Sequence, residues 1–140
     1  MSNIKSSLIF ENYIVELIEF KANYSYSGGD KKIDFYIIND YNFEQNNFVL
    51  HLEAVVFPDA EKNDYPFTLK VRIAGVFRID GNIDESVVKN YIEVNSIAIL
   101  FPYLRAMISN YTVNANVGNV ILPPINVVKY LEEKRKRTGN

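Results

Sequence analysis

The residue best suited to acid–base chemistry at neutral pH is the single histidine, His51. It lies within residues 48–57, where it alternates with apolar side chains in the manner of a β-strand. A catalytic base needs an orienting partner and a nucleophile close by, and the residues around His51 supply neither. We therefore interpret His51 as a surface or interface residue of a strand rather than as a catalyst.

Patterns for metal or phosphate binding are absent from the sequence. The chain has no cysteine, so it offers no thiolate ligand, disulfide or cysteine nucleophile. The carboxylates Asp59, Glu61 and Asp64 lack the spacing and central glycine of a calcium loop, and they suit a solvated loop. Neither a P-loop nor a G-x-S-x-G motif occurs. The sequence thus predicts no enzyme, no metal site and no cofactor.

The one run of like charge is "KRKR" at residues 134–137. From Lys129 onward there are five basic and two acidic side chains, a local charge of +3, while the whole chain is −2 and the remainder is therefore −5. Basic residues favour the C-terminal end of a helix, so we interpret this run as a solvated helix end. The overall negative charge argues against a nucleic-acid partner.

Length and composition indicate one domain spanning residues 1–140. The N-terminal "MSNIKSSLIFENYIV" lacks the basic start, apolar run and cleavage site of a signal peptide. No stretch of about 18 uncharged apolar residues is present. We therefore expect a cytoplasmic protein without membrane insertion.

Strand-like segments fill the first half of the chain and helix-like segments the second half. Alternating β-branched and aromatic residues predict strands over residues 7–24, 33–40, 48–57 and 67–80, with a turn at 41–47 and a possible bulge at Gly75. Helical spacing predicts helices over residues 83–94, with Asp84 as N-cap, from 95–100 to 114, and over 127–137. Because proline lacks an N–H, we expect Pro102 in the first turn of the middle helix.

This order predicts an α+β fold: a four-stranded antiparallel sheet with a long helix and a C-terminal helix packed on one face. Some strands are apolar on both sides, as where Val15 and Leu17 alternate with Ile14 and Ile18. Such strands need covering on both sides, and two helices cover little more than one face. The excess apolar surface predicts an oligomer, a peptide-binding groove, or both.

Two motifs in the second half resemble the SecB family of protein-export chaperones. The stretch "ILFPYLR" at residues 99–105 is similar to the family's "ILFPYAR", and "LPPIN" at residues 122–126 is similar to its "L-x-P-V-N" element. The matching positions are Leu100, Phe101, Pro102, Tyr103, Arg105, Pro124 and Asn126. The resemblance implies a four-stranded antiparallel sheet crossed by a long helix, subunits assembled as a homotetrameric dimer of dimers, and an ATP-independent chaperone that holds unfolded polypeptides in apolar grooves.

The same resemblance implies particular site residues. It places client binding at Ile33, Phe35, Ile37 and Leu131. It places residues that affect subunit assembly at Leu69, Val71 and Ile73.

The family's acidic contacts to the SecA motor do not transfer to this chain. The corresponding positions are Leu17, Lys21 and Lys70, and the family's acidic tail is replaced by the basic segment 129–137. Exchanging acidic for basic residues at a complementary interface removes attraction and adds repulsion, which argues against the usual coupling to SecA. Glu16 and Glu19 are nearby acids that could substitute for the missing contacts.

Three interpretations stay open from the sequence. The first is a SecB-like holdase for unfolded clients, with or without a role in protein export. The second is a dedicated SecB-like chaperone that stabilises the antitoxin of a toxin–antitoxin pair, which suits the departures at Leu17, Lys21 and Lys70. The third is an oligomeric scaffold without chaperone activity.

Overall fold

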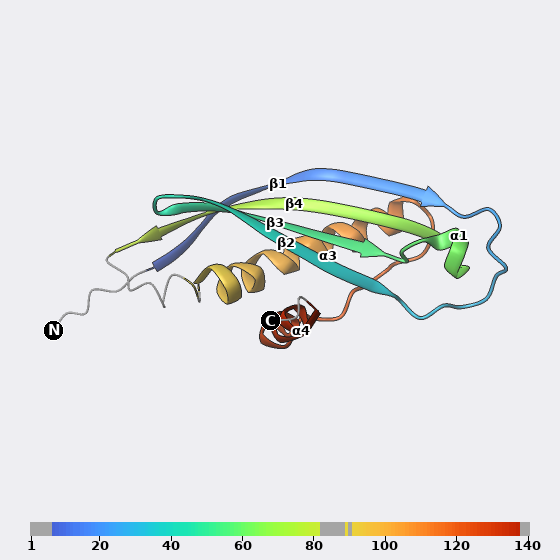
Figure 1. The fold of residues 1–140 in the computed structure, drawn as a ribbon. Coiled ribbons are helices and arrows are strands. Elements are labelled where there is room, and N and C mark those ends of the chain that lie inside the picture. The colour runs from blue at the N-terminus through green and yellow to red at the C-terminus, as the bar shows by residue number, and fades with distance from the viewer. Residues whose placement is uncertain (1–6, 82–88, 90, 138–140) are drawn as a thin grey trace.

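A four-stranded antiparallel sheet forms one layer of the molecule. The computed structural model describes residues 7–81, 89 and 91–137. The strands run in the order β1-β4-β3-β2 (Figure 1). Their bounds are Ser7–Ala22 for β1, Phe35–Glu44 for β2, Asn47–Val56 for β3 and Phe67–Asp80 for β4. The predicted sheet is confirmed, and the predicted bounds of β4 match.

Strand β2 differs from its prediction at both ends. It begins at Phe35, so Ile33 lies in the preceding loop, and it continues through residues 41–44, which were expected to turn. The turn is confined to Gln45 and Asn46 because Glu44 pairs with Asn47 and Gln45 adopts a left-handed conformation with φ 55°. The asparagines in this segment suggested a loop, yet Tyr41 and Phe43 both pack their rings against Phe48 on β3.

Two irregularities in β1 change which of its apolar side chains lie on each face of the strand. The pairing with β4 shifts between Phe10 and Asn12 and again between Val15 and Leu17. Each extra residue reverses the alternation, so six apolar side chains lie on the face that packs on the core, while Ile9, Ile14 and Leu17 lie on the opposite face. The β1 residues that pack against the core are Leu8, Phe10, Tyr13, Val15, Ile18 and Phe20.

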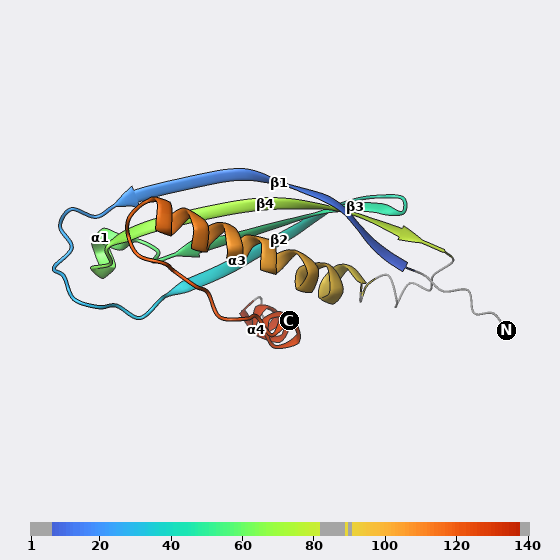
Figure 2. The ribbon, with the colours of Figure 1, turned by 180° about the vertical axis from the view of Figure 1, so that it is seen from behind.

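Helix α3, Ser96–Asn114, lies across one face of the sheet and forms the second layer (Figure 2). Its side chains Ile97, Leu100, Leu104 and Ile108 are fully buried. The continuous helical stretch Ile92–Asn114 is long and apolar enough to cross a membrane by composition alone. Because one face of the helix is buried against the sheet, it is the core helix of this domain.

Gly75 permits the close approach of α3 to β4. A Cβ atom at this position would lie 2.9 Å from Leu100 Cδ1 and 3.0 Å from Phe77 Cε1. The pairing of β4 with β3 is continuous through Gly75, so the predicted bulge is absent there. The glycine serves packing between the two layers.

The position of Pro102 in the helix also differs from its prediction. A π-helical turn, η1 at Tyr91–Asn95, precedes α3 directly, so Pro102 lies inside a continuous helix. Proline removes the N–H that would bond the Ala98 carbonyl, but Ala98 and Pro102 are both exposed and water can reach that group. The predicted helix start at Asp84 lies outside the described residues.

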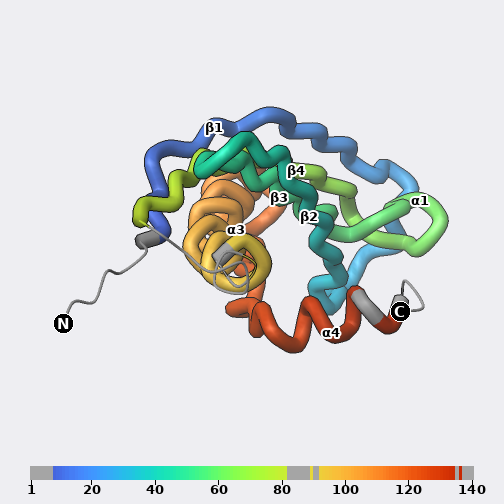
Figure 3. Tube along the Cα trace, turned by 60° about the vertical axis from the view of Figure 1, so that its left-hand side comes forward, coloured from blue at the N-terminus to red at the C-terminus, as the bar shows by residue number. Residues whose placement is uncertain are grey.

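Two smaller helices complete the described part of the chain. The short helix α1, Ala60–Asn63, lies in the connection between β3 and β4. Helix α4, Val127–Arg137, follows an irregular segment and lies beside β2 and the η1 turn that precedes α3 (Figure 3). In the described part of the chain, one face of the sheet is left without a helix, and β1 and β2 lie at the two edges.

Candidate functional site

An open cavity of about 350 Å³ lies between β2 and the N-terminal part of α4. Phe35 and Ile37, two of the predicted client-binding residues, contribute to its wall. The complete lining is Phe35, Tyr36, Ile37, Pro124, Ile125, Asn126, Lys129, Tyr130 and Glu133. We call this cavity the β2–α4 groove.

A second open cavity of about 380 Å³ continues along the same two stretches of chain. Ile33 lines it together with Phe57 and Phe67 on one side and residues 117–120 on the other. The two cavities share no lining residue, but residues 33 and 35–37 of one stretch and residues 117–120 and 124–126 of the other border them in sequence order. Ile33 therefore borders a cavity from a loop and not, as predicted, from a strand.

Leu131, the fourth predicted client-binding residue, is not among the lining residues of either cavity. It is 9% exposed and packs in the core on the buried side of α4. Its neighbour Tyr130 lines the groove instead. Consecutive residues of a helix point about 100° apart. Tyr130 therefore faces the groove while Leu131, the next residue, is buried.

Polar contacts hold α4 beside the edge strand. The Tyr130 hydroxyl lies 2.7 Å from Asn39 Oδ1 and 3.3 Å from the Ile37 carbonyl oxygen, and Lys134 Nζ donates to Asn39 Oδ1 at 3.0 Å. Asn39 is only 6% exposed, so these donors satisfy a buried amide oxygen. The sequence analysis missed this contact, although an asparagine in the inward-facing series of Phe35 and Ile37 was a visible signal.

Tyr41, on the same edge strand, fixes the start of the long helix. Its hydroxyl donates to the Ile92 carbonyl at 3.0 Å. Burial raises the pKa of the Tyr41 phenol above its ordinary value, and the nearby Glu93 raises it further. The phenol therefore stays protonated and acts as a structural donor at neutral pH.

The motif residues have structural roles that explain their types. Leu100 and Phe101 are buried, whereas Tyr103 is 40% exposed and its ring centroid lies 4.8 Å from that of Tyr13.

Arg105 Nε donates to the Leu122 carbonyl at 2.5 Å and ties α3 to the segment that lines the groove. Pro124 borders that groove.

Asn126 caps α4. Its Oδ1 accepts the backbone N–H of Lys129 at 3.0 Å, which is the usual N-cap geometry. The asparagine of the "LPPIN" element thus fixes where the last helix begins.

Leu69, Val71 and Ile73 lie in the core. Each is 0% exposed and packs in the core beneath the helical layer. They have no exposed surface to offer a second copy, so the predicted effect of these three residues on subunit assembly would be indirect. The alternating β4 residues on the opposite face include Lys70, Arg72, Val76 and Arg78.

The face of the sheet without a helix carries a charge cluster around Arg72. Its guanidinium lies 3.1 Å from Glu16, 3.3 Å from Asp40 and 3.7 Å from Glu53. His51 joins this cluster, with Nδ1 2.9 Å from Glu16 Oε1 and Nε2 2.8 Å from Asn42 Oδ1. Both ring nitrogens are engaged, which supports the interpretation of His51 as a strand residue of this face.

Acids on this face are paired with cations. Glu19 lies 3.8 Å from Lys70, and Glu11 lies 3.2 Å from Arg78. The two candidate substitutes for the missing SecA contacts, Glu16 and Glu19, thus each have a cation within 4 Å, but Arg72 is shared among three carboxylates and the Glu19 side chain is 62% exposed. Within residues 7–81, 89 and 91–137, no group of three or more histidine, aspartate or glutamate side chains could hold a metal ion.

A four-stranded antiparallel sheet crossed by one long helix, with an open groove beside an edge strand, defines the SecB-like class of chaperone folds. The chain itself belongs to the SecB family, since the family described as "Preprotein translocase subunit SecB" matches residues 30–138. Proteins of this family are soluble chaperones without enzymatic activity, so the prediction that the chain is not an enzyme is confirmed.

Similar proteins occur in archaea and bacteria. An uncharacterized protein of Methanocaldococcus jannaschii is 39% identical over 129 residues, covering 88% of this chain and 81% of its own length. The protein-export protein SecB of Nitrosomonas europaea is 35% identical over 77 residues, which cover 55% of this chain and 47% of that protein. The match thus spans about half the length of this SecB relative.

A solved structure shares the fold at low sequence identity. It is the SecB-like chaperone Rv1957 of Mycobacterium tuberculosis, in complex with a ChAD peptide from the HigA1 antitoxin. The TM-score is 0.65 and the identity 12%, with 85% of this chain and 88% of that chain covered. The predicted fold class is therefore confirmed.

Proposed function

We propose that this protein is an ATP-independent holdase that keeps unfolded polypeptide segments in the β2–α4 groove and its continuation past Ile33. The observation that carries the proposal is the pair of open hollows lined by Phe35, Ile37, Pro124 and Ile125 in one and Ile33 and Phe57 in the other. Burial of apolar client surface yields about 25 cal/mol per Å² whatever the sequence. Such a groove suits many clients and requires no nucleotide.

The proposal includes assembly of the chain as a homo-oligomer, a dimer of dimers, in the cytoplasm. Strand β1 supports it, because it is a 16-residue edge strand whose Ile14 is 64% exposed. Long edge strands with apolar side chains are prone to pair with another chain. Several grooves in one assembly would raise client affinity by avidity.

Suppression of aggregation tests the holdase proposal. A chemically unfolded client is diluted into buffer with and without a stoichiometric amount of the protein, and light scattering is followed. We expect scattering to fall with the parent protein and to recover with Phe35→Asp, which places a charge in the groove. Tyr24→Asp is the matched control, since Tyr24 is 99% exposed and lines neither groove cavity.

The outcome is decided by comparing the two variants, once circular dichroism shows that both are folded. A folded Phe35→Asp variant that protects clients as well as the parent contradicts this groove as the binding site. If neither parent nor variants bind clients while a stable tetramer forms, the protein is an oligomeric scaffold.

A dedicated chaperone for an antitoxin is the second candidate. Two observations favour it: the shared fold with a SecB-like chaperone bound to an antitoxin peptide, and the replacement of the family's acidic SecA-contact positions by Leu17, Lys21 and Lys70. Basic residues at a complementary interface remove attraction and add repulsion, which disfavours the usual contact with SecA. Binding assays with purified SecA separate the two candidates, because tight binding would favour a role in export.

A further inference from the structure

Helix α4, which forms one wall of the β2–α4 groove, is the basic part of the molecule. Its eleven residues carry five basic and two acidic side chains, so it has a charge of +3 in a chain whose total is −2. The clustering matters because a local excess of charge attracts or repels a partner over about a Debye length, about 10 Å at 0.1 M salt.

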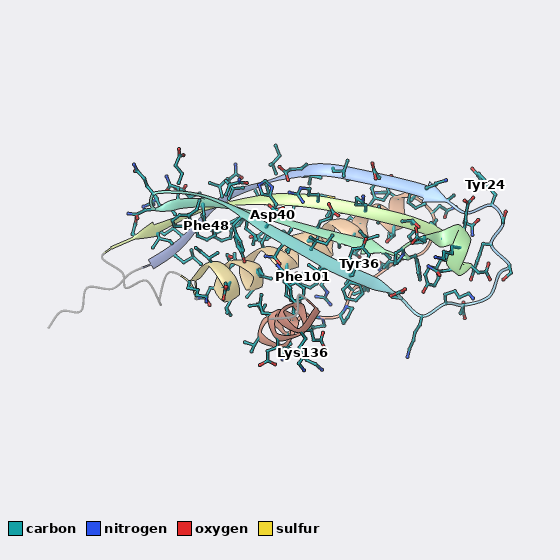
Figure 4. The ribbon with its side chains drawn as sticks, in the orientation of Figure 1. Tyr24, Tyr36, Asp40, Phe48, Phe101 and Lys136 are labelled. Atoms are coloured by element: carbon teal, nitrogen blue, oxygen red, sulfur yellow. The ribbon has the colours of Figure 1, made fainter. Side chains whose placement is uncertain are left out.

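The basic side chains lie where a bound segment would pass. Lys129 lines the groove directly, and Glu133 is the one acid among the lining residues. Lys136 is seven residues beyond Lys129, which is two helical turns, so both lysines share one face of α4. Lys136 is exposed on α4, and Tyr36 lies on the neighbouring strand β2 (Figure 4).

The acids that share α4 with these lysines are Glu132 and Glu133. Among the described residues, no ion pair within 4 Å joins Lys129, Lys134 or Lys136 to an acid; the described ion pairs of other lysines and arginines involve Lys31, Lys70, Arg72 and Arg78. Lys134 reaches the neutral Asn39 amide, so its charge is also left uncompensated. The positive charge beside the groove is therefore available to a partner.

We propose that the groove selects client segments in which an apolar anchor is flanked by acidic residues. The anchor fills the cavity between Phe35 and Ile125, and the flanking carboxylates lie along the Lys129–Lys136 face of α4. This inference rests on the proposed holdase function and adds the chemical class of the client. A polypeptide suits the site better than a nucleic acid because the lysines adjoin an apolar cavity and the rest of the chain is negative.

Fluorescence anisotropy with two short labelled peptides tests the inference. Both have the same central phenylalanine–leucine segment; one has aspartate flanks and the other lysine flanks. We expect the acidic peptide to bind roughly tenfold more tightly at about 50 mM salt, and the difference to shrink at about 500 mM salt. The double variant Lys129→Gln, Lys136→Gln should weaken the acidic peptide about three- to tenfold.

The control variant Lys21→Gln, Lys62→Gln removes two exposed charges beside α1 and should leave both affinities unchanged. Equal affinities of the two peptides, tighter binding of the basic one, or equal losses in the two double variants would overturn the inference while leaving the holdase function in place. Displacement of the acidic peptide by a single-stranded oligonucleotide would also overturn it. If neither peptide binds, the proposed groove function itself fails.

Discussion

At the scale of single residues, Gly75 is where the two layers come closest. A methyl group at this position would lie 2.9 Å from Leu100 Cδ1, and Leu100 is fully buried. We expect Gly75→Ala to lower the free energy of unfolding by about 1–3 kcal/mol through overpacking. Urea denaturation measures the change as a lower midpoint at an unchanged slope.

A double-mutant cycle separates overpacking from a backbone effect of the substitution. In a Leu100→Ala background the methyl group has room, so Gly75→Ala should cost less there or even stabilise. An equal cost in both backgrounds would show that contact with Leu100 is not the cause.

Tyr41 makes stability depend on alkaline pH. Burial raises its pKa in the folded protein above the ordinary value near 10, so above that pH the unfolded chain loses this proton before the folded protein does. The contribution is complete below about pH 10 and is lost as the pH rises through the folded pKa. We expect the free energy of unfolding to fall less steeply between about pH 9.5 and 11 in Tyr41→Phe than in the parent.

Tyr36, on the same strand and 46% exposed, supplies the control for this measurement. A Tyr36→Phe variant should keep the slope of the parent protein. If Tyr41→Phe also keeps it, then ionisation of Tyr41 does not contribute to alkaline unfolding.

At the scale of elements, α4 is attached to the edge strand by a few polar contacts. Tyr130→Phe removes the hydroxyl that lies between Asn39 and the Ile37 carbonyl while keeping the ring. A hydrogen bond contributes about 0.5–1.5 kcal/mol net, so amide hydrogen exchange in α4 should quicken by roughly two- to tenfold. Exchange within β3 and β4 should stay as in the parent.

Tyr103→Phe is the matched control for this experiment, because Tyr103 is 40% exposed on α3 and its hydroxyl has no hydrogen bond to a described residue. Quickened exchange in α4 in both variants would mean that the Tyr130 hydroxyl does not hold the helix.

The sequence predicted the strands and helices better than the register shifts and the π-helical turn within them. The alternation of apolar and polar residues was enough to predict the bounds of β4, which match those in the structure. A strand that is buried on one face shows a clear period of two in its sequence. The extra residues in β1, Glu11 and Glu16, were not recognised because a single carboxylate in an alternating strand also suits an ordinary outward-facing position. The π-helical turn before α3 also has no local signature, and the composition of η1 suits an ordinary helix.

The groove was predictable only through the family resemblance. Phe35 and Pro124 are 89 positions apart, and no local pattern states that β2 and the segment before α4 meet. The resemblance supplied Ile33, Phe35 and Ile37 but placed Leu131 one helical position from the residue that lines the cavity. Consecutive residues of a helix point about 100° apart. An alignment to the family that is wrong by one residue therefore assigns the groove-facing role to a buried residue.

At the scale of the whole molecule, the sheet has two unequal edges. Helix α4 lies beside β2, whereas β1 is 16 residues long and has no helix at its outer edge in the described part of the chain. Natural sheets protect such edges with charges, bulges or a partner. The two register shifts of β1 provide some protection, but Ile14 between them is 64% exposed.

We therefore expect the protein to sediment as an oligomer of its 16.1 kDa chain at micromolar concentration, and Ile14→Lys to shift the distribution toward monomer. A lysine at this position adds two like charges to a symmetric interface and desolvates both. Analytical ultracentrifugation over a concentration series gives the dissociation constant for each variant. Val128→Lys is the control, since Val128 is 56% exposed on α4 near the opposite edge of the sheet. Equal effects of the two substitutions, or a parent protein that is monomeric throughout, would contradict assembly through β1 and would leave each groove to bind its client alone.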